Sequence, residues 1–251
     1  MQLADLSPLQ ILLAFIGAAG IGFSKSGFAG VGMVHVVIFA FVFGARQSTG
    51  ILLPLLIVGD ICAVKLFGSE VQWPHVRRLL IPSSIGVCIG WLMMGQLDES
   101  AFKPVVGSII LGLTLTQIAR LWRPRLFERI VPHAFWFAWT LGLLAGITTM
   151  LANAAGPIVA LYLLAVALPK YQLIGTSAWF FFILNVFKLP FSATLGLIDL
   201  DTLLLNATFA PAILLGMFFG RWLVHRIPQR LFDSILLVFT ALFALRLIGC
   251  F

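Results

Sequence analysis

Charged residues are scarce in this chain of 251 residues: Asp, Glu, Lys and Arg make up 10% of it, whereas 61% is hydrophobic. A soluble domain cannot bury so large a share of apolar side chains, so a water-soluble fold is excluded. The mean hydropathy of +1.09 and the repeated apolar runs instead predict an all-α polytopic membrane protein surrounded by lipids.

The chain has little acidic charge to balance its lysines and arginines, and its net charge is +7. A basic balance can indicate a nucleic-acid partner. Here the basic residues lie in short loops between apolar segments, which is typical of a membrane topology signal. No nucleic-acid partner is expected.

Cysteine is rare, and Cys62, Cys88 and Cys250 all fall inside apolar segments without CxxC spacing. This pattern excludes a disulfide framework and argues against a metal site. The HExxH motif is absent, and GFSKSG differs from the GxSG arrangement of intramembrane serine proteases, although Ser24 and His35 offer a nucleophile and a base. We expect no enzyme activity and no cofactor.

The first ten residues contain Asp5 but no Lys or Arg. A cleavable signal peptide has a basic n-region, so we expect the first apolar run to be retained.

Ten apolar segments follow one another in two sets of five. The first set covers residues 9–22, 31–43, 50–67, 79–95 and 103–122, and the second covers 134–149, 157–168, 174–195, 203–222 and 231–249. We therefore predict a first membrane repeat at 1–122, a cytoplasmic basic linker at 123–133 and a second membrane repeat at 134–251.

Several residues recur in the same order in both sets, which supports a duplicated unit. The pairs are Gly22 with Gly146, Gly32 with Gly156, Gly50 with Gly175, Asp60 with Asn185, Gly86 with Gly216, Gly90 with Gly220, and Phe102 with Phe232. GxxxG spacing at 86–90, 142–146 and 216–220 would allow close helix approach.

Loop charges indicate that the two repeats are inverted. If each opening helix pair forms a hairpin or two full crossings, ten basic residues gather on one face and three on the other. The positive-inside rule then places both termini outside the cytoplasm. We expect the protein to lie in a bacterial plasma (inner) membrane, with periplasmic termini. The first group contains Arg77, Arg78, Arg120, Arg123, Arg125, Arg129, Lys170, Arg221, Arg226 and Arg230, and the second contains Arg46, Lys103 and Arg246.

Each repeat opens with a short or re-entrant helix pair that is broken by glycines, at Gly22 to Gly32 and at Gly146 to Pro157. Unpaired backbone groups survive in a bilayer only beside protein or a watery cavity. Inversion would bring the two breaks together at the midplane, where helix N-termini favour an anion.

Lys25 is the leading candidate for a substrate-binding charge, because a cation in hydrocarbon needs a cavity or a partner. The alternative is a lysine that reaches the interface. The other candidates in the two breaks offer donors or close backbone approach. They are Ser24, Ser26, Gly27, Gly30, Thr148, Thr149, Asn153 and Gly156.

Asp60 lies well within a spanning segment and is the candidate ion-coupling residue, with Asn185 at the related position. It is either a proton or sodium site or the partner of a buried lysine such as Lys25 or Lys188. Lys188 is a second candidate cation for the substrate, unless it reaches toward a surface.

Hydroxyl-bearing residues open the third segment of each half: Ser48 and Thr49 in one, Thr176 and Ser177 in the other. They resemble helix N-caps, and they could also face the cavity and bind substrate. His35 on an apolar run is more typical of a hydrogen-bonded structural residue.

This layout resembles the TauE/SafE family of anion transporters, also called the toluene sulfonate uptake permease family. The resemblance covers nearly the whole chain and rests on IGAAGIGFSKSGFAGVG, on the Gly175, Thr176 and Ser177 element, and on the Gly216xxxGly220 helix. Lys25 interrupts the small or apolar residues that are usual in the opening break. The family motif assigns no binding residue.

The resemblance implies secondary transport of a sulfur-containing anion such as sulfite, sulfoacetate, thiosulfate or a sulfonate. We expect alternating access around the midplane site with H⁺ or Na⁺ as the coupling ion, in a monomer or homodimer. An anion channel is the alternative function, and an intramembrane enzyme is a more remote one.

Overall fold

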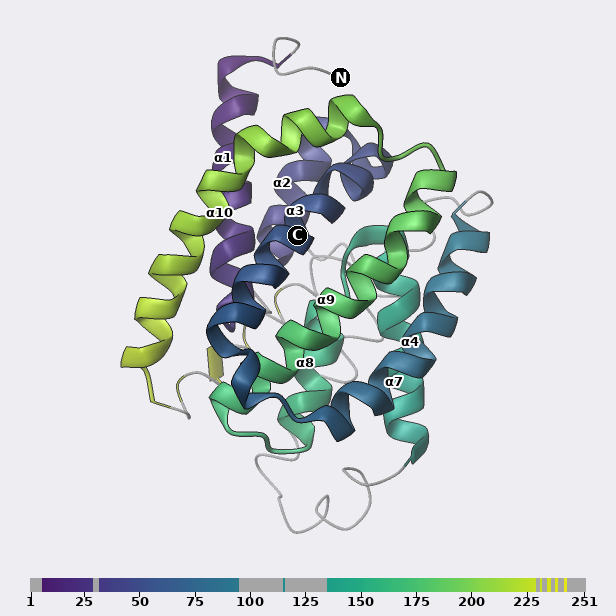
Figure 1. The fold of residues 1–251 in the computed structure, drawn as a ribbon, viewed down its shortest axis with the longest axis vertical. Helices are drawn as coiled ribbons and strands as arrows, with labels where there is room; N and C mark the ends of the chain where they lie inside the picture. Colours follow the sequence, from purple (N-terminus) through teal and green to yellow (C-terminus); the bar gives the residue numbers. More distant parts are fainter. Residues whose placement is uncertain are drawn as a thin grey trace.

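The computed structural model describes residues 6–28, 32–94 and 135–228, with Leu115, Leu231, Ser234, Ile235, Val238 and Leu242 as isolated positions. In these parts all secondary structure is helical, which confirms the all-α prediction (Figure 1). The predicted segment 103–122, the linker 123–133 and the segment 231–249 fall outside the continuously described residues. The helices are α1 (Pro8–Lys25), α2 (Gly32–Phe43), α3 (Ala45–Phe67), the 3₁₀ turn η3 (Gly68–Glu70), α4 (Trp73–Met93), α7 (Phe135–Ala152), α8 (Gly156–Ala165), α9 (Lys170–Thr194) and α10 (Leu200–Arg226).

Five of these helices are long and apolar enough to cross a membrane: α1, α3, α4, α9 and α10. The prediction of a polytopic membrane protein is therefore confirmed. α2 has 12 residues and α8 has 10. At 1.5 Å per residue these two cover about 18 and 15 Å, which is less than a hydrocarbon core of ~30 Å.

The helix boundaries correct the sequence prediction in two places. α1 continues to Lys25 and α7 to Ala152, so the chain leaves helical geometry over fewer residues than expected. In a bilayer a helix satisfies the hydrogen-bonding groups of the backbone, so the helix is favoured to extend as far as the sequence permits. α3 begins at Ala45 and α9 at Lys170, so Ser48 and Thr176 lie inside helices and are not N-caps.

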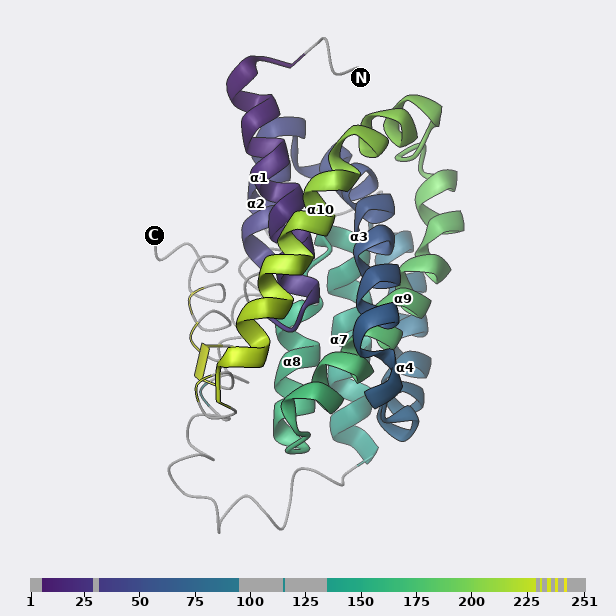
Figure 2. The same cartoon turned by 60° about the vertical axis from the view of Figure 1, so that its left-hand side comes forward.

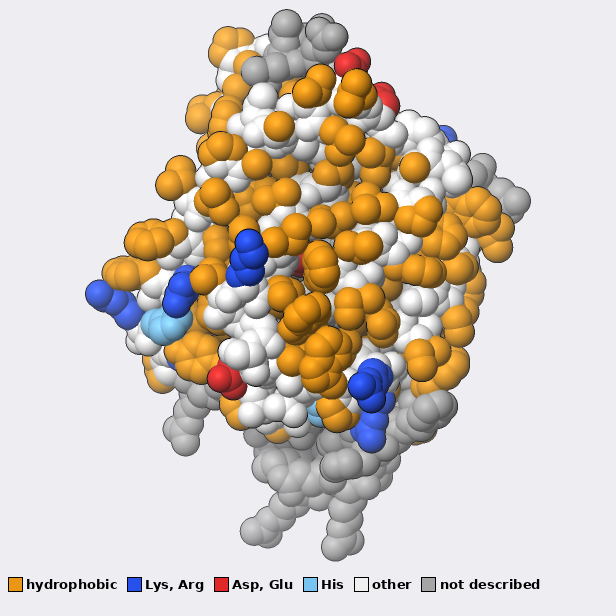
Figure 3. Space-filling view, viewed as in Figure 1, with side chains coloured by type: hydrophobic (Ala, Val, Ile, Leu, Met, Phe, Trp, Pro, Cys, Tyr) orange, Lys and Arg blue, Asp and Glu red, His pale blue; other side chains and the backbone are white. Residues whose placement is uncertain are grey.

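α3, α8 and α9 form the centre of the molecule, with α1 and α10 on one side and α4 and α7 on the other (Figures 1 and 2). Every residue of α8 from Pro157 to Ala165 is buried, as expected for a helix that is apolar all round. The outer helices expose large apolar side chains, and hydrophobic side chains cover most of the face in Figure 3. This surface suits contact with lipid.

Glycines allow the outer helices to approach closely in pairs. A Cβ on Gly216 of α10 would lie 1.8 Å from the carbonyl oxygen of Ala19 on α1. A Cβ on Gly146 of α7 would lie 2.0 Å from the carbonyl oxygen of Ser83 on α4. These contacts confirm the expectation that the GxxxG pairs are packing sites.

The helix contacts have counterparts in the two halves. α1 packs on α10 as α7 packs on α4, and α3 packs on α10 as α9 packs on α4. The central pair, α3 and α9, is antiparallel, because Gly50 abuts the Leu197 carbonyl at one end and Gly175 abuts the Phe67 carbonyl at the other. The C-terminus of α10 lies at the same end as Gly175 and Phe67, because the Lys170 ammonium donates to the carbonyls of Val224 and Ile227 at 2.9 and 2.6 Å.

That end of the molecule is the basic end, and we define it by Arg77, Arg78, Lys170, Arg221 and Arg226. The opposite end contains Arg46 near the start of α3 and the turn between α9 and α10. In this turn, Asp199 caps α10 by accepting from the hydroxyl and the N–H of Thr202 at 2.6 and 2.7 Å. These two hydrogen bonds hold the pKa of Asp199 below its ordinary value.

Candidate functional site

A cavity of about 50 Å³ lies where the two helix interruptions meet. A single ordered water needs ~10–15 Å³, so this volume holds more than one water or a compact anion. Its lining comes from both halves of the chain. The lining residues are Ser24, Lys25, Gly27, Gly32, His35, Leu56, Thr149, Asn153, Gly156, Ile174, Ser177, Ala178, Phe181 and Asn185.

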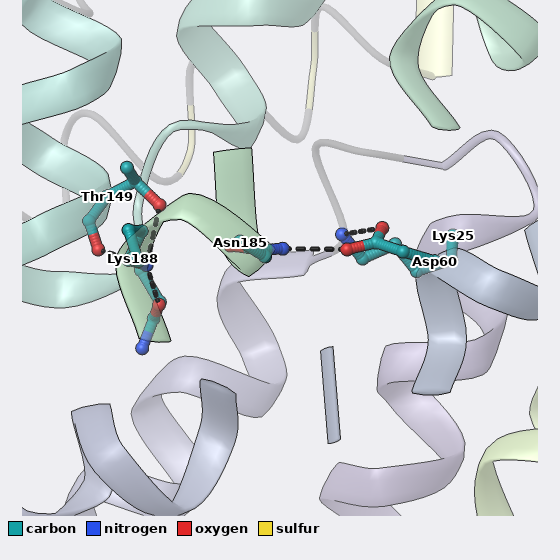
Figure 4. Close-up of polar contacts among 6 residues, drawn as sticks. Lys25, Asp60, Thr149, Asn185 and Lys188 are labelled. Atoms are coloured by element: carbon teal, nitrogen blue, oxygen red, sulfur yellow. Dashed lines mark hydrogen bonds and ion pairs between the residues drawn. The ribbon is translucent and has the colours of Figure 1, made fainter. Parts of the chain in front are cut away.

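Lys25, Asp60 and Asn185 form a chain of polar contacts beside the cavity (Figure 4). The Lys25 Nζ lies 2.6 Å from Asp60 Oδ1, and Asn185 Nδ2 donates to Asp60 Oδ2 at 2.7 Å. The Asp60 side chain is fully buried, whereas that of Lys25 is 11% exposed. Asp60 is thus the partner of a buried lysine, which is one of the two roles that the sequence left open.

Two neighbours position the Lys25 side chain. A Cβ on Gly59 would lie 3.2 Å from Lys25 Cγ, so the absence of a side chain there leaves room for the lysine stem against α3. The ammonium lies 4.4 Å from the centre of the Phe181 ring. A cation over an aromatic face is attracted by the ring quadrupole. Lys25 is therefore held between α3 and α9 and does not extend to the surface.

Lys188 forms a second cluster at the other interruption (Figure 4). Its ammonium donates to the Thr149 carbonyl at 2.8 Å, to Thr149 Oγ1 at 3.1 Å and to Asn153 Oδ1 at 2.7 Å. These three neutral acceptors match the three N–H donors of a lysine. Lys188 is 2% exposed and is not among the residues that line the cavity, so it does not reach a surface.

Asn153 connects this cluster to the first half of the chain. It has a positive φ of 52° just after α7, a conformation that asparagine tolerates better than most residues. Its side-chain Nδ2 donates to the Thr49 carbonyl of α3 at 3.1 Å. The second interruption is therefore held against α3 as well as against α9.

Three polar atoms in the cavity wall have no hydrogen-bond partner among the described residues: His35 Nδ1, Ser177 Oγ and Asn185 Oδ1. Native proteins rarely leave such groups unpaired, so they indicate a place for water or a ligand. The sequence interpretation of His35 as a hydrogen-bonded structural residue is not supported at Nδ1. This histidine is 3% exposed and lines the cavity.

Two short helices begin at the cavity. Gly32 is the first residue of α2, Gly156 is the first residue of α8, and both line the cavity wall. The first N–H groups of a helix have no partner within it and carry the positive end of its dipole. Together with Lys25 they give the cavity a positive character.

The structure places the predicted site residues in three groups. Those that line the cavity are Ser24, Lys25, Gly27, Thr149, Asn153, Gly156, Ser177 and Asn185. Those that lie behind or beside the lining are Ser26, Ser48, Thr49, Asp60, Thr148, Thr176 and Lys188. Gly30 lies outside the described residues.

Several residues of the second group have local roles. The hydroxyls of Ser26, Thr49 and Thr148 donate to carbonyls of Phe23, Arg46 and Ala145 in the preceding helical turn. The Thr176 hydroxyl accepts from the backbone N–H of Gln72 at 2.9 Å. The first three contacts are local to one helical turn, whereas the Thr176 contact ties α9 to the residue that precedes α4.

Sequence reasoning missed Leu56, Ile174 and Ala178 in the apolar part of the lining. Ile174, Ala178 and Phe181 lie with Ser177 and Asn185 on one stripe of α9. Residues three and four apart share a helix face, so this spacing was a usable signal. Leu56 precedes Asp60 by one turn of α3 in the same way. Gly32, which the sequence marks as the end of the first break and the counterpart of Gly156, also lines the cavity.

Five helices long and apolar enough to cross a membrane, together with a cavity lined by polar residues from both halves of the chain, indicate a multi-pass membrane protein. Within the described ranges, no group of three or more His, Cys, Asp or Glu side chains is placed to hold a metal ion. The family model described as Sulfite exporter TauE/SafE matches residues 13–247, and the chain belongs to this family. No curated protein and no solved structure matches the chain.

Proposed function

We propose that the protein is a secondary active transporter that moves a small sulfur-containing anion of the sulfonate, sulfite, sulfoacetate or thiosulfate type across the membrane. The family supports a sulfur anion as substrate. The observation that carries the proposal is the cavity itself, which is lined by Lys25 from one interruption and by Thr149 and Asn153 from the other.

The charges around the cavity favour an anion. Lys25 is balanced by Asp60, whereas the described contacts of Lys188 are all with neutral acceptors. Two lysines and one aspartate leave one positive charge without a carboxylate in this buried region. Coulomb attraction is much stronger in a low-dielectric interior than in water, so an anion in the cavity gains from both lysines.

The size and lining of the cavity favour a compact anion. Hydroxyl and ammonium donors from Ser24, Ser177 and Lys25 suit an oxyanion, which accepts several hydrogen bonds at once. Leu56, Ile174 and Phe181 provide an apolar wall for a short organic group. An aryl sulfonate would require this wall to open further than in the present conformation.

Alternating access is supported by the correspondence between the two halves. The packing of α10 on α1 and α3 has a counterpart in the packing of α4 on α7 and α9, and the two interruptions meet at one cavity. We infer two inverted repeats, each beginning with a short helix pair, that rock against each other around the bound anion.

Transport by purified protein in proteoliposomes tests this function. Uptake of radiolabelled sulfite, thiosulfate and methanesulfonate is measured for the wild-type protein and for Lys25→Met. Loss of a charged hydrogen-bond donor costs about 1.5–3 kcal/mol, so we expect binding of the transported anion to weaken about ten- to hundredfold. Lys65→Met removes the same charge from an exposed position on α3 and serves as the control.

The double variant Lys25→Met with Asp60→Asn separates binding from folding. In Lys25→Met alone, Asp60 remains as an unpaired buried carboxylate, which destabilises a fold by about 3–5 kcal/mol. The double variant removes both charges, so it should recover thermal stability but not transport. Recovery of full transport would show that the pair is only structural. Counterflow of labelled anion, which a channel does not support, distinguishes a carrier from an anion channel.

A further inference from the structure

Lys25 belongs to two environments at once. It forms the ion pair with Asp60, and its side chain also lines the cavity. Lys188, by contrast, has its ammonium surrounded by three protein acceptors and is absent from the cavity wall. Of these two lysines, only Lys25 is in a position to exchange its partner for a ligand.

Such an exchange would remove the ion-pair partner of the buried Asp60 carboxylate. Its carboxylate is fully buried and its Oδ1 is paired with Lys25, while its Oδ2 accepts only a neutral amide N–H from Asn185. An anion that takes Lys25 would leave the Asp60 carboxylate without its ion-pair partner, and the described hydrogen bonds of the other nearby lysine, Lys188, are to neutral acceptors only. A buried charge that loses its partner either attracts a counter-ion or becomes neutral.

We propose that Lys25 exchanges Asp60 for the substrate anion, and that Asp60 takes up one proton in the same step. This mechanism rests on the proposed transport function and assigns the coupling ion. Lys25 stays an ammonium throughout, an O–H bond forms on the Asp60 carboxyl, and no other bond changes. The added charges of a monovalent anion such as methanesulfonate and a proton cancel, whereas for divalent thiosulfate the proton cancels one charge and the positive charge of Lys188 offsets the other.

Asn185 is suited to both states of Asp60. Its Nδ2 donates to the carboxylate, and its Oδ1 is buried without a partner among the described residues. A protonated Asp60 is a donor and needs an acceptor. Rotation of the Asn185 amide presents Oδ1 to that new O–H, so the same side chain satisfies the carboxylate before anion binding and the carboxylic acid after it.

The oxygens near Asp60 favour a proton over a metal cation. Hard cations are held by several oxygen ligands. Here the described contacts of the Asp60 carboxylate are with two donors, the Lys25 ammonium at 2.6 Å from Oδ1 and the Asn185 amide N–H at Oδ2. A sodium ion would have to displace that ammonium and find most of its ligands elsewhere, whereas a proton needs only Asp60.

The other ionisable groups near Asp60 have distinct roles. Lys25 comes from α1, and Lys188, on the same helix as Asn185, adds a positive charge from α9. His35 of α2 lines the same cavity and is a possible rival proton acceptor. In the described parts of α7 and α10, no charged side chain lines the cavity.

Proton uptake on anion binding is the direct test. The purified full-length protein in weakly buffered detergent with a pH-indicator dye is mixed with thiosulfate or methanesulfonate, neither of which changes its own protonation near neutral pH. We expect uptake of about one proton per anion, and by linkage an affinity that falls about tenfold for each unit rise in pH above neutrality. Replacing Na⁺ with K⁺ should leave the affinity unchanged.

Asp60→Asn provides the decisive comparison. The variant mimics the protonated residue, so we expect anion binding that persists, takes up no proton and no longer depends on pH. Asp201→Asn removes a carboxylate from an exposed position of α10 and should behave as the wild type. Thermal unfolding of each variant in detergent verifies that it is folded, and Asp60→Glu should retain coupled binding if Asp60→Asn fails to fold.

The outcomes distinguish a failure of the proposed transport function from a failure of the proposed proton coupling. If neither anion binds to the wild-type protein, the proposed function fails, and the coupling mechanism fails with it. If an anion binds without proton uptake, or only in the presence of Na⁺, the function stands and the coupling mechanism is wrong. Proton uptake that persists in Asp60→Asn would assign the proton to another group, of which His35 is the first candidate.

Discussion

A lysine buried in a membrane protein needs partners both for its charge and for its three N–H donors. Lys188 finds three neutral acceptors and Lys25 finds one carboxylate, an aromatic face and a cavity. The first arrangement satisfies every donor within the protein. The second leaves donor capacity for a ligand, which is why we assign anion binding to Lys25.

Single residues also determine how α8 and α9 end. Two residues after α8, Ala167 has a positive φ of 56°, and the N–H of Leu168 donates to the Leu163 carbonyl at 3.3 Å. Two residues after α9, Gly196 has a φ of 67°, and the N–H of Leu197 donates to the Ser192 carbonyl at 3.1 Å. This backbone conformation strongly favours glycine at the position that α8 fills with alanine.

We predict that Ala167→Gly stabilises the protein. The left-handed conformation costs an L-residue about 1–2 kcal/mol, and part of this is offset by the greater freedom of glycine in the unfolded chain. We expect a gain of about 0.5–1 kcal/mol, measured as a higher midpoint of thermal unfolding in detergent.

Gly196→Ala is the matched reverse change. A Cβ there would meet nothing within 4 Å, so only the backbone conformation is tested. It should lower the midpoint by a similar amount. An unchanged midpoint in both variants would mean that the left-handed residues do not limit stability.

Much of the residue-scale site follows from the sequence, because Lys25, Asp60 and Lys188 are charges in apolar segments and few explanations fit them. Their pairing does not follow. The sequence allowed Asp60 to pair with either lysine, and only the path of α1 beside Gly59 brings Lys25 to it. The place of His35 in the cavity lining does not follow from the sequence either, because it depends on neighbours in other helices.

At the scale of helices, glycines set how closely α1 and α10 pack. A Cβ on Gly216 would overlap Ala19 O, and a Cβ on Gly22 would lie 1.9 Å from the carbonyl oxygen of Ile213. Backbone atoms cannot move aside as a flexible side chain does. Because Lys25 is the last residue of α1, the position of this helix also decides where the ammonium lies.

Gly216→Ala should therefore both destabilise the protein and impair anion binding. Overpacking costs about 1–3 kcal/mol, and the forced separation of α1 from α10 displaces Lys25. Thermal unfolding and binding of thiosulfate measure the two effects.

Gly20→Ala is the control on the same helix, since its Cβ would lie 3.7 Å from the nearest atom, His35 Cβ. Its stability should change by less than about 1 kcal/mol. Equal effects of the two substitutions would contradict the packing explanation.

The positions of the helices could be predicted from apolar runs, and the eight predicted segments in the described ranges are all helical. The residues at which these helices begin and end could not be predicted in this way. α3 and α9 each begin one to two turns before their apolar runs, because polar residues such as Gln47 and Gln172 continue a helix without adding hydropathy. Hydroxyl residues that resembled caps are consequently interior.

For the molecule as a whole, the two ends differ in charge. The basic end gathers five arginines and lysines from α4, α9 and α10, whereas Arg46 lies at the opposite end. Positive charge is retained in the cytoplasm during insertion. We infer that the basic end is cytoplasmic and that the turn between α9 and α10 is periplasmic.

Cysteine labelling tests this orientation. In a variant without native cysteines, Glu70→Cys lies at the basic end and Asp201→Cys lies at the opposite end, both at exposed positions. A membrane-impermeant maleimide applied to intact spheroplasts should label Asp201→Cys. Glu70→Cys should react only after permeabilisation, and the reverse pattern would contradict the assigned topology.

Recurring glycines in the sequence predict a duplicated order of segments. They do not predict that the two halves carry different polar residues at related positions. Lys25 and Thr149 lie at related positions of the two repeats, spaced as Gly22 is from Gly146, yet one carries a charge and the other accepts from Lys188. Ala63 stands at the position in α3 that Lys188 holds in α9, with the spacing of Asp60 and Asn185. The two halves are therefore chemically unequal at these related positions.

For the carrier that we propose, this inequality affects the resting state. In a carrier with two identical inverted halves, the states open to either side are related by symmetry and have the same free energy. Here the half that contains Lys25 and Asp60 has an ion pair to break, whereas the half that contains Lys188 has none. The two open states would therefore differ in free energy even with equal solutions on both sides, and the carrier would rest preferentially with its cavity facing one compartment.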